Sequence, residues 1–147
     1  MFKTELKEVL GVTGEKTIAV VGNGPSILGK GLGKEIDDHE VVIRFNAFMT
    51  AGYEQDTGRR MNVWCTCFSR NLFRHTGLRN IANASAVLFP RRAGLLNQKG
   101  LRRDLIKECK GKLVCKPTHL DRELCNRLKK RPTSGVSIVH WLFREGF

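Results

Sequence analysis

Two glycines, an asparagine and a serine follow the first strongly apolar run of the chain, and these residue types suit the binding of a phosphate. The β-branched run Thr17–Val21 stops at a loop that contains Gly22, Asn23, Gly24 and Ser26. Glycine lets backbone N–H groups approach a ligand and adopts positive φ. A helix that starts after the loop would add unpaired N–H groups and the positive end of its dipole. The spacing matches neither the dinucleotide motif nor the Walker A loop, so a plain strand-to-helix turn is an equally good interpretation.

A second apolar run, Glu40–Asn46, ends in residues that could also meet a nucleotide. In a regular strand Arg44 and Asn46 point to one face and Phe45 to the other. An amide at the end of the strand offers two donors and an acceptor. The simpler alternative is that Asn46 caps a turn and that Arg44 is a solvated charge.

These loops need elements that bring them together, and strand-like and helix-like segments alternate along the chain. This pattern predicts an α/β fold with a mainly parallel sheet, in which ligands bind beyond the carboxyl ends of the strands. The predicted strands are Thr17–Val21, Glu40–Asn46, Met61–Cys67, Ala86–Pro90 and Lys112–Cys115. The predicted helices are a short one within residues 1–15, then Ile27–Lys34, Ser69–Asn80, Leu101–Lys110, Asp121–Lys130 with Asp121 as N-cap, and Val136–Arg144.

The composition favours one domain with an anionic partner. The chain has 147 residues and a net charge of +12, and such a surplus predicts nucleic acid, an acidic membrane surface, a nucleotide sugar or an anionic glycan as partner. Neither a signal peptide nor an apolar run long enough to span a bilayer is present in the sequence, so we expect a cytoplasmic protein that also contacts membranes peripherally.

Five cysteines are expected to be reduced and structural. Cys65 and Cys67 lie two apart in an apolar stretch and are predicted to be buried on one face of a strand. No Cys-x-x-Cys pair is present, so no metal site is predicted. The basic run Lys129–Arg131 either supports a phosphate or forms a solvated helix end.

A longer pattern of residues resembles a known family. The segment Val20–Ser26, followed by Gly33, Asp37, His39, Arg44-Phe45-Asn46, Asp56 and Gly58, is similar to the large sialylmotif of the CMP-sialic-acid-dependent sialyltransferases. The turn Pro132–Gly135, followed by an apolar helix, looks like the start of the small sialylmotif.

The resemblance implies one domain over residues 1–147 with a variant nucleotide-sugar-transferase fold, a three-layer α/β sandwich of the GT-A-like, Rossmann type. CMP-sialic acid would be the donor, and its sialic acid would pass with inversion to a hydroxyl of a glycan acceptor, without metal or cofactor. Asn23 and Asn46 match the family's two donor-contacting asparagines, and Thr133, Ser134 and Gly135 match its small-motif turn. Together with Gly22, Gly24 and Ser26, these are the predicted donor-binding residues.

The chain departs from the family in two respects. Ile18 stands where animal members have the first cysteine of a disulfide, so the chain resembles the bridge-free microbial type. The family's general base is a histidine in a later motif, and this chain stops at Phe147 before it, so no catalytic base is assigned among His39, His75, His119 and His140. Two alternatives to an enzyme stay open, namely a donor-binding remnant without turnover and, less favoured, a basic nucleic-acid-binding protein. The sequence does not indicate the acceptor, the linkage or the oligomeric state.

Overall fold

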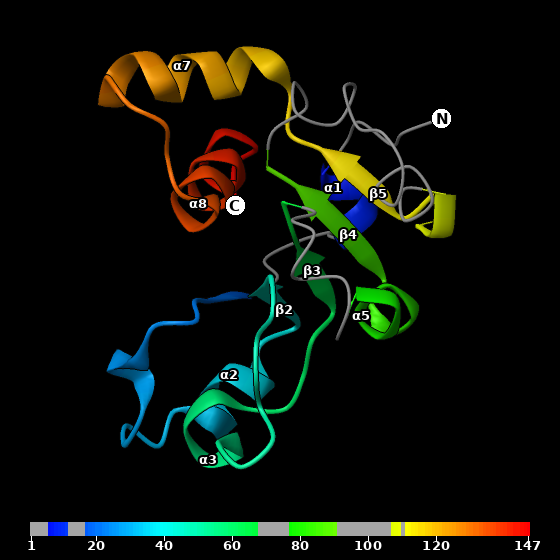
Figure 1. The fold of residues 1–147 in the computed structure, drawn as a ribbon, viewed down its shortest axis with the longest axis vertical. Helices are drawn as coiled ribbons and strands as arrows, with labels where there is room; N and C mark the ends of the chain where they lie inside the picture. The colour runs from blue at the N-terminus through cyan, green and yellow to red at the C-terminus, as the bar shows by residue number, and fades with distance from the viewer. Residues whose placement is uncertain (1–5, 12–16, 68–76, 91–106, 110) are drawn as a thin grey trace.

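A single parallel sheet organises the molecule. The computed structural model describes residues 6–11, 17–67, 77–90, 107–109 and 111–147. Its five strands lie side by side in chain order and all run parallel (Figure 1). They are β1 (Ile18–Val21), β2 (Val41–Phe45), β3 (Val63–Cys65), β4 (Ala86–Phe89) and β5 (Leu113–Cys115). All five predicted strands are therefore confirmed, each somewhat shorter than expected.

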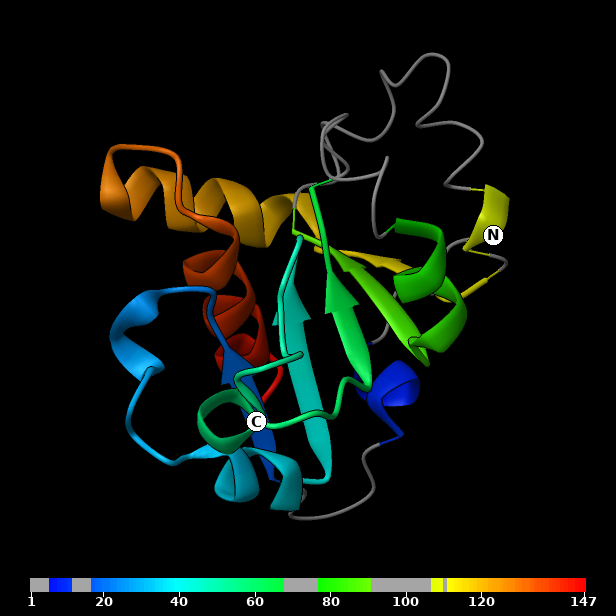
Figure 2. The same cartoon turned by 60° about the horizontal axis from the view of Figure 1, so that its bottom comes forward.

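The sequential strand order explains how the helices are distributed. Right-handed crossovers between successive parallel strands all pass over the same face of a sheet. That face carries α2 (Gly33–Asp38) and α5 (Gly77–Asn83), whose Ile36 and Ile81 pack on the strands between which each helix runs. The opposite face is left for helices outside the crossovers, which are α1 (Leu6–Leu10), α7 (Thr118–Leu128) and α8 (Ser134–Arg144). The three layers confirm the predicted α/β sandwich (Figure 2).

The larger core lies between the sheet and α8. Ile138 and Trp141 are 0% exposed and pack against apolar residues from β2, β3, β4 and β5. Helix α8 therefore packs on this face of the sheet. Because it begins at Ser134, it holds the small-motif match, Pro132–Gly135, in place. Among the described residues no helix is long and apolar enough to span a membrane.

Helix boundaries were predicted less well than strands. The expected helix Ile27–Lys34 is wrong, because the segment contains Gly29 and Gly31 in left-handed conformations and forms only a 3₁₀ turn at Pro25–Ile27 before α2 begins. A short helix, α3 (Glu54–Thr57), was not predicted.

The later helices are shifted relative to the prediction. Helix α7 begins at Thr118 after Pro117, so Asp121 lies within its first turn and is not the N-cap. Only the ends of the predicted helices Ser69–Asn80 and Leu101–Lys110 fall within the described residues, where α5 begins at Gly77 and residues 107–108 are helical. The final helix begins at Ser134 instead of Val136.

Candidate functional site

The two predicted asparagines meet at the carboxyl ends of adjacent strands. The Asn23 carboxamide nitrogen Nδ2, just beyond β1, donates to the backbone oxygen of Phe45 at 2.9 Å. Phe45 is the last residue of β2, and Asn46 follows it directly. The parallel pairing of β1 with β2 therefore brings Asn23 and Asn46 to neighbouring strand ends on one edge of the sheet.

Asn46 has a left-handed backbone that fastens it to the neighbouring strand. Its φ is +48°, a conformation that asparagine tolerates better than most residues. Its N–H donates to the Cys65 oxygen at 2.8 Å, and its own oxygen accepts from the Trp64 indole at 2.8 Å. Its Oδ1 accepts from the backbone N–H of Cys67 at 3.4 Å. These bonds hold Asn46 rigidly, as a ligand-binding residue requires.

A pocket of about 260 Å³ opens beside this junction. The loop from Gly22 to Pro25 forms one wall, and Phe48 and Tyr53 from the segment after β2 form another. Asn23 lines the pocket, whereas Asn46 does not. Of the predicted loop residues, Ser26 lies instead in a neighbouring hollow on the other side of the loop.

Gly22 and Gly24 line the pocket without a side chain that would fill it. The expected positive φ is wrong for both residues. Gly24 has φ −72°, and neither glycine is among the residues with positive φ. A Cβ atom at Gly22 would meet nothing within 4 Å, and one at Gly24 would lie 3.7 Å from the Ser26 hydroxyl. The backbone of the loop is consequently accessible to a ligand. The expected contribution of a helix dipole is also wrong, because only a three-residue 3₁₀ turn follows.

Asp56 fixes the far end of this loop, a role that the sequence analysis did not assign. Its two carboxylate oxygens accept the N–H groups of Gly29 and Gly31, each at 2.8 Å. Both glycines have positive φ, at 74° and 66°. The two hydrogen bonds lower the pKa of the Asp56 carboxyl below its ordinary value of 3.8.

The lowered pKa of Asp56 predicts a loop that loosens in acid. A carboxyl whose pKa is lowered in the folded state stabilises that state above the ordinary pKa, and the contribution is lost as pH falls toward the folded value. We expect the Gly29 and Gly31 amides of the wild type to lose protection from hydrogen exchange only as the pH falls below the ordinary carboxyl value of 3.8. In Asp56→Asn, we expect weak protection of these amides at every pH. Asp38→Asn, whose carboxylate contacts the exposed Lys34, is the control and should leave both amides protected at pH 7. Equal protection in wild type and Asp56→Asn at pH 7 would contradict this assignment.

Arg44 is buried, so its interpretation as a solvated charge is wrong. Its side chain is 2% exposed, donating Nε to the Arg60 oxygen at 2.7 Å and Nη2 to the Thr57 oxygen at 2.6 Å. The guanidinium carbon lies 5.5 Å from the centre of the Phe48 ring. Burial lowers the pKa of Arg44, and Asp37 acts in the opposite direction. Since Arg44 also lines the pocket, its charge raises the electrostatic potential there.

Thr133, Ser134 and Gly135 lie at the start of α8. Thr133 is the N-cap, and its hydroxyl oxygen accepts from the Val136 N–H at 3.4 Å. Ser137, one turn on, donates its hydroxyl to the oxygen of Pro90 at 3.3 Å, and Pro90 directly follows β4. The small-motif turn is thereby placed at the carboxyl edge of the sheet, the edge that also carries Asn23 and Asn46. No hydrogen bond joins the two groups in the described part of the chain, and the turn does not line the pocket.

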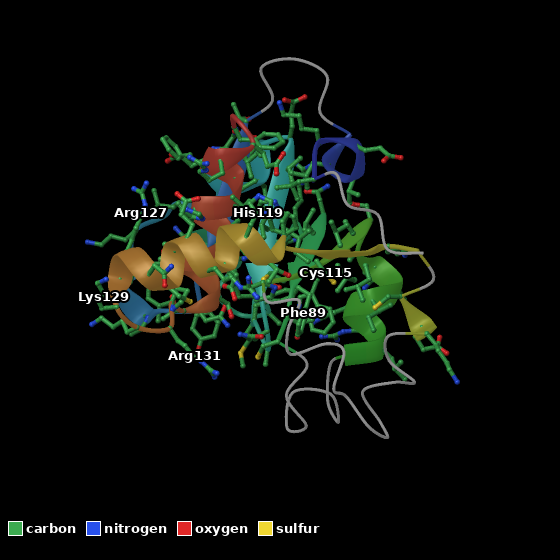
Figure 3. All side chains as sticks on the ribbon, turned by 90° about the horizontal axis from the view of Figure 1, so that it is seen from above. Phe89, Cys115, His119, Arg127, Lys129 and Arg131 are labelled. Atoms are coloured by element: carbon green, nitrogen blue, oxygen red, sulfur yellow. The ribbon has the colours of Figure 1, made fainter. Side chains whose placement is uncertain are left out.

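The described histidines lie outside the pocket. His39 lines the neighbouring hollow, where its Nδ1 contacts the Glu35 oxygen at 2.7 Å. His140 is mostly buried on α8, and burial together with Lys116 lowers its pKa. His119 lies exposed at the start of α7 (Figure 3). His75 lies outside the described residues.

The structure also places the cysteines and the basic run Lys129–Arg131. Cys65 is 0% exposed, and burial raises its pKa, whereas Cys67 is exposed, so the predicted burial is wrong for Cys67 because β3 ends at Cys65. None of the five cysteines forms a disulfide. Lys129 and Arg131 extend from the far end of α7, and the run is a solvated helix end (Figure 3). No cluster of three or more metal-ligating side chains occurs among the described residues.

Comparisons with known proteins identify the family. Residues 3–93, more than half of the chain, match the model of glycosyltransferase family 29 (sialyltransferase). Beta-galactoside alpha-2,6-sialyltransferase 2 of Danio rerio is 50% identical over 50 residues, which cover 34% of this chain and 10% of that protein. The Homo sapiens protein of the same name is 44% identical over 50 residues with the same coverage. Sialyltransferase-like protein 2 of Oryza sativa subsp. indica is 37% identical over 75 residues, covering 45% of this chain and 19% of that protein.

The match therefore spans only a tenth to a fifth of these relatives, from 10% to 19% of their length. The residues that meet at the ends of β1 and β2 all lie within the part that the family model covers. The chain belongs to glycosyltransferase family 29, the sialyltransferases.

Proposed function

We propose that the pocket beside Asn23 binds the CMP part of CMP-sialic acid, and that the chain takes part in transferring sialic acid to a glycan hydroxyl. The observation that carries the proposal is the hydrogen bond from Asn23 to Phe45, which holds the Asn23 carboxamide in the wall of the pocket beside the accessible loop. A nucleotide phosphate requires several N–H donors that converge without a carboxylate among them. Gly22, Gly24 and Asn23 all line the pocket, and we infer that their N–H groups serve as these donors.

The charge of the chain supports the same ligand. Arg44 stands behind the pocket, and the chain carries a net charge of +12, which attracts anionic ligands. With this field a phosphate can be neutralised without a divalent ion, so the proposed reaction is metal-independent. Thr133–Gly135, on the same edge of the sheet, would meet a part of the donor that extends beyond the pocket.

Transfer itself requires one group more than the pocket supplies. In the proposed reaction the acceptor oxygen forms a bond to the anomeric carbon, the bond to the phosphate oxygen breaks, and CMP leaves. The acceptor hydroxyl must lose its proton to a general base. His39, His119 and His140 do not line the pocket, which favours, as a second candidate, binding of CMP without turnover by this chain alone.

Calorimetric titration with CMP tests the donor site, and the variant of choice is Asn46→Gly. Glycine accepts the φ of +48° without strain, so the substitution removes the carboxamide and leaves the backbone as it is. We expect the wild type to bind CMP and Asn46→Gly to bind it at least ~10-fold more weakly, the effect of losing roughly one good hydrogen bond.

Asn83→Gly is the matched control, because Asn83 is exposed at the end of α5, next to the amino end of β4. This variant should bind CMP as the wild type does. Because Asn46 does not line the pocket, equal affinities of wild type and Asn46→Gly would contradict its role in donor binding, and a wild type that does not bind CMP would contradict the donor site itself. Turnover of CMP-sialic acid with a simple galactoside then separates the enzyme from the remnant. Binding of RNA that weakens steeply with salt and is not displaced by CMP would favour the nucleic-acid alternative.

A further inference from the structure

Lys116 is a fully buried lysine at the carboxyl edge of the sheet. It directly follows β5, and its N–H donates to the oxygen of Phe89, the last residue of β4, at 3.0 Å. Its exposed fraction is 0%. Figure 3 labels Phe89 and Cys115, the paired residues with which β4 and β5 end. Lys116 is therefore fixed at the same edge of the sheet as Asn23 and Asn46.

The side chain of Lys116 reaches the first turn of α8. Its nitrogen Nζ donates to the Ser137 hydroxyl at 3.1 Å, and that hydroxyl donates to the Pro90 oxygen at 3.3 Å. A hydroxyl has only one proton to donate. Since a carbonyl oxygen can only accept, the Ser137 proton is directed to Pro90, and the lysine must be the donor in its bond to Ser137. These two bonds join the ends of β4 and β5 to α8.

Ser137 connects this attachment to the small-motif turn. Its N–H donates to the Thr133 oxygen at 3.0 Å, which closes the first turn of the helix. Thr133 also caps α8 through its hydroxyl oxygen, which accepts from the Val136 N–H at 3.4 Å. The positions of Thr133, Ser134 and Gly135 therefore depend on where Ser137 is held.

Stability alone does not favour a lysine at this position. Lysine is almost never fully buried, because its charged group loses the water that solvates it. A positive charge is also unfavourable near the amino end of a helix, which is where the Lys116 side chain meets α8. An apolar residue of similar length, such as methionine, would fill the space without these costs. The lysine therefore points to a requirement for holding the start of α8 in one position.

We propose that Lys116 is a positioning residue for the donor, which holds Ser137 so that Thr133 and Ser134 meet the sugar part of CMP-sialic acid. This inference rests on the proposed function. Lys116 itself does not touch the ligand, because its side chain is buried. Lys116, Ser137 and Thr133 do not line the pocket beside Asn23. Loss of the attachment should therefore affect binding of the sugar part and leave binding of the CMP part intact.

Calorimetric titrations with CMP and with CMP-sialic acid distinguish positioning from a general loss of stability. In Lys116→Met we expect the affinity for CMP-sialic acid to fall at least ~10-fold, the effect of losing roughly one charged hydrogen bond, while the affinity for CMP changes less than about 3-fold. Ser137→Ala removes the other partner and should produce the same difference between the two ligands. Because both substitutions remove one bond, the double variant should bind no more weakly than the weaker single variant.

Lys112→Met is the matched control, because Lys112 is also held by hydrogen bonds but lies at the amino end of β5. Its Nζ donates to the oxygens of Ile81 and Ala84 at 3.3 Å and 2.9 Å. This variant should lose stability in urea, since these carbonyl groups lose their donor, but should bind CMP and CMP-sialic acid as the wild type does.

The pKa of His140 tests the placement of Lys116 without any ligand. Burial and then Lys116 lower the pKa of His140, and Arg144 and Arg127 act in the same direction. Glu123, whose carboxylate lies 3.9 Å from the ring nitrogen Nε2, raises it. Removal of a nearby cation favours the protonated ring. Titration followed by NMR should therefore show a higher His140 pKa in Lys116→Met than in the wild type, and no change in the matched control.

Several results would overturn the proposal. Lys116 would not act on the sugar part if Lys116→Met bound CMP-sialic acid as the wild type does, or if its affinities for both ligands fell equally. If Lys116→Met does not fold, Ser137→Ala decides by the same criterion. An unchanged His140 pKa would contradict the position of the Lys116 side chain beside α8. A wild type that binds neither ligand would contradict the proposed function, and the donor role of Lys116 with it, whereas binding of both ligands without the expected difference would contradict this inference alone.

Discussion

Replacing Gly33 with alanine is expected to lower the free energy of unfolding by about 3 kcal/mol or more, the range of severe overpacking. A Cβ atom at Gly33 would lie 2.0 Å from the backbone oxygen of Glu54 and 2.6 Å from that of Gln55. Backbone atoms cannot move aside as a flexible side chain can. Helix α2 would have to separate from α3, and the segment that carries Asp56 would move with it.

Gly24→Ala provides the control within the same loop region. Gly24 has φ −72° and ψ 146°, which alanine adopts readily, and its Cβ would lie no closer than 3.7 Å to another group. Alanine there restricts the unfolded chain, so this variant should be neutral or more stable by up to about 1 kcal/mol. Unfolding in urea measures both variants. If the two substitutions had the same effect, the close contact of α2 with α3 would not determine the stability of this region.

The sheet and the meeting of the two asparagines could be predicted from the sequence. Short β-branched runs that end at glycine or proline are a strong signal for buried parallel strands, and the strands were found where the runs lie. Once β1 and β2 are parallel neighbours, Asn23 and Asn46 must lie on the same edge. The prediction needed no knowledge of side-chain contacts.

The loop between β1 and α2 could not be predicted in the same way. Gly29 and Gly31 lie in a segment whose helical and looped forms differ little in local preference, and the difference is made by Asp56, which follows them by 27 and 25 residues. A contact so distant in sequence has no local signal. The reason given for the glycines of the predicted phosphate loop, Gly22 and Gly24, was also wrong. Positive φ occurs at Gly29 and Gly31 instead.

Helix starts depend on details that residue types alone do not decide. Aspartate and threonine are both common N-cap residues. Of Asp121 and Thr133, only Thr133 accepts a hydrogen bond from a backbone N–H in the first turn of its helix. In α7 the N-cap position falls on Pro117, which follows the buried Lys116. The end of β5 thus decides where the helix begins, and that depends on tertiary packing.

The interpretation of Arg44 as a solvated charge was the error with the largest consequence for the site. The observed burial of Arg44 leads to a second strong prediction. Arg44→Met should lower the free energy of unfolding by about 3 kcal/mol, because one buried and one partly buried carbonyl group lose charged donors. The carbonyl oxygens belong to Thr57 and Arg60, and the Asp37 carboxylate binds the same segment through the N–H groups of Arg59 and Arg60. Methionine fills much of the volume, so the change tests the hydrogen bonds more than the packing.

Two further substitutions show which property of Arg44 matters. Arg44→Lys keeps the charge but cannot reach both oxygens with one ammonium group, and should lose about half as much stability. Arg59→Met removes an exposed arginine from the same segment and should cost less than about 0.5 kcal/mol. If Arg44→Met were as stable as Arg59→Met in urea, the two bonds would not hold this segment. If Arg44→Met instead loses stability as expected, CMP titration of the folded variant separates the two roles of the guanidinium. A further loss of affinity, compared with Arg44→Lys, would show that its charge, and not only its hydrogen bonds, acts on the pocket.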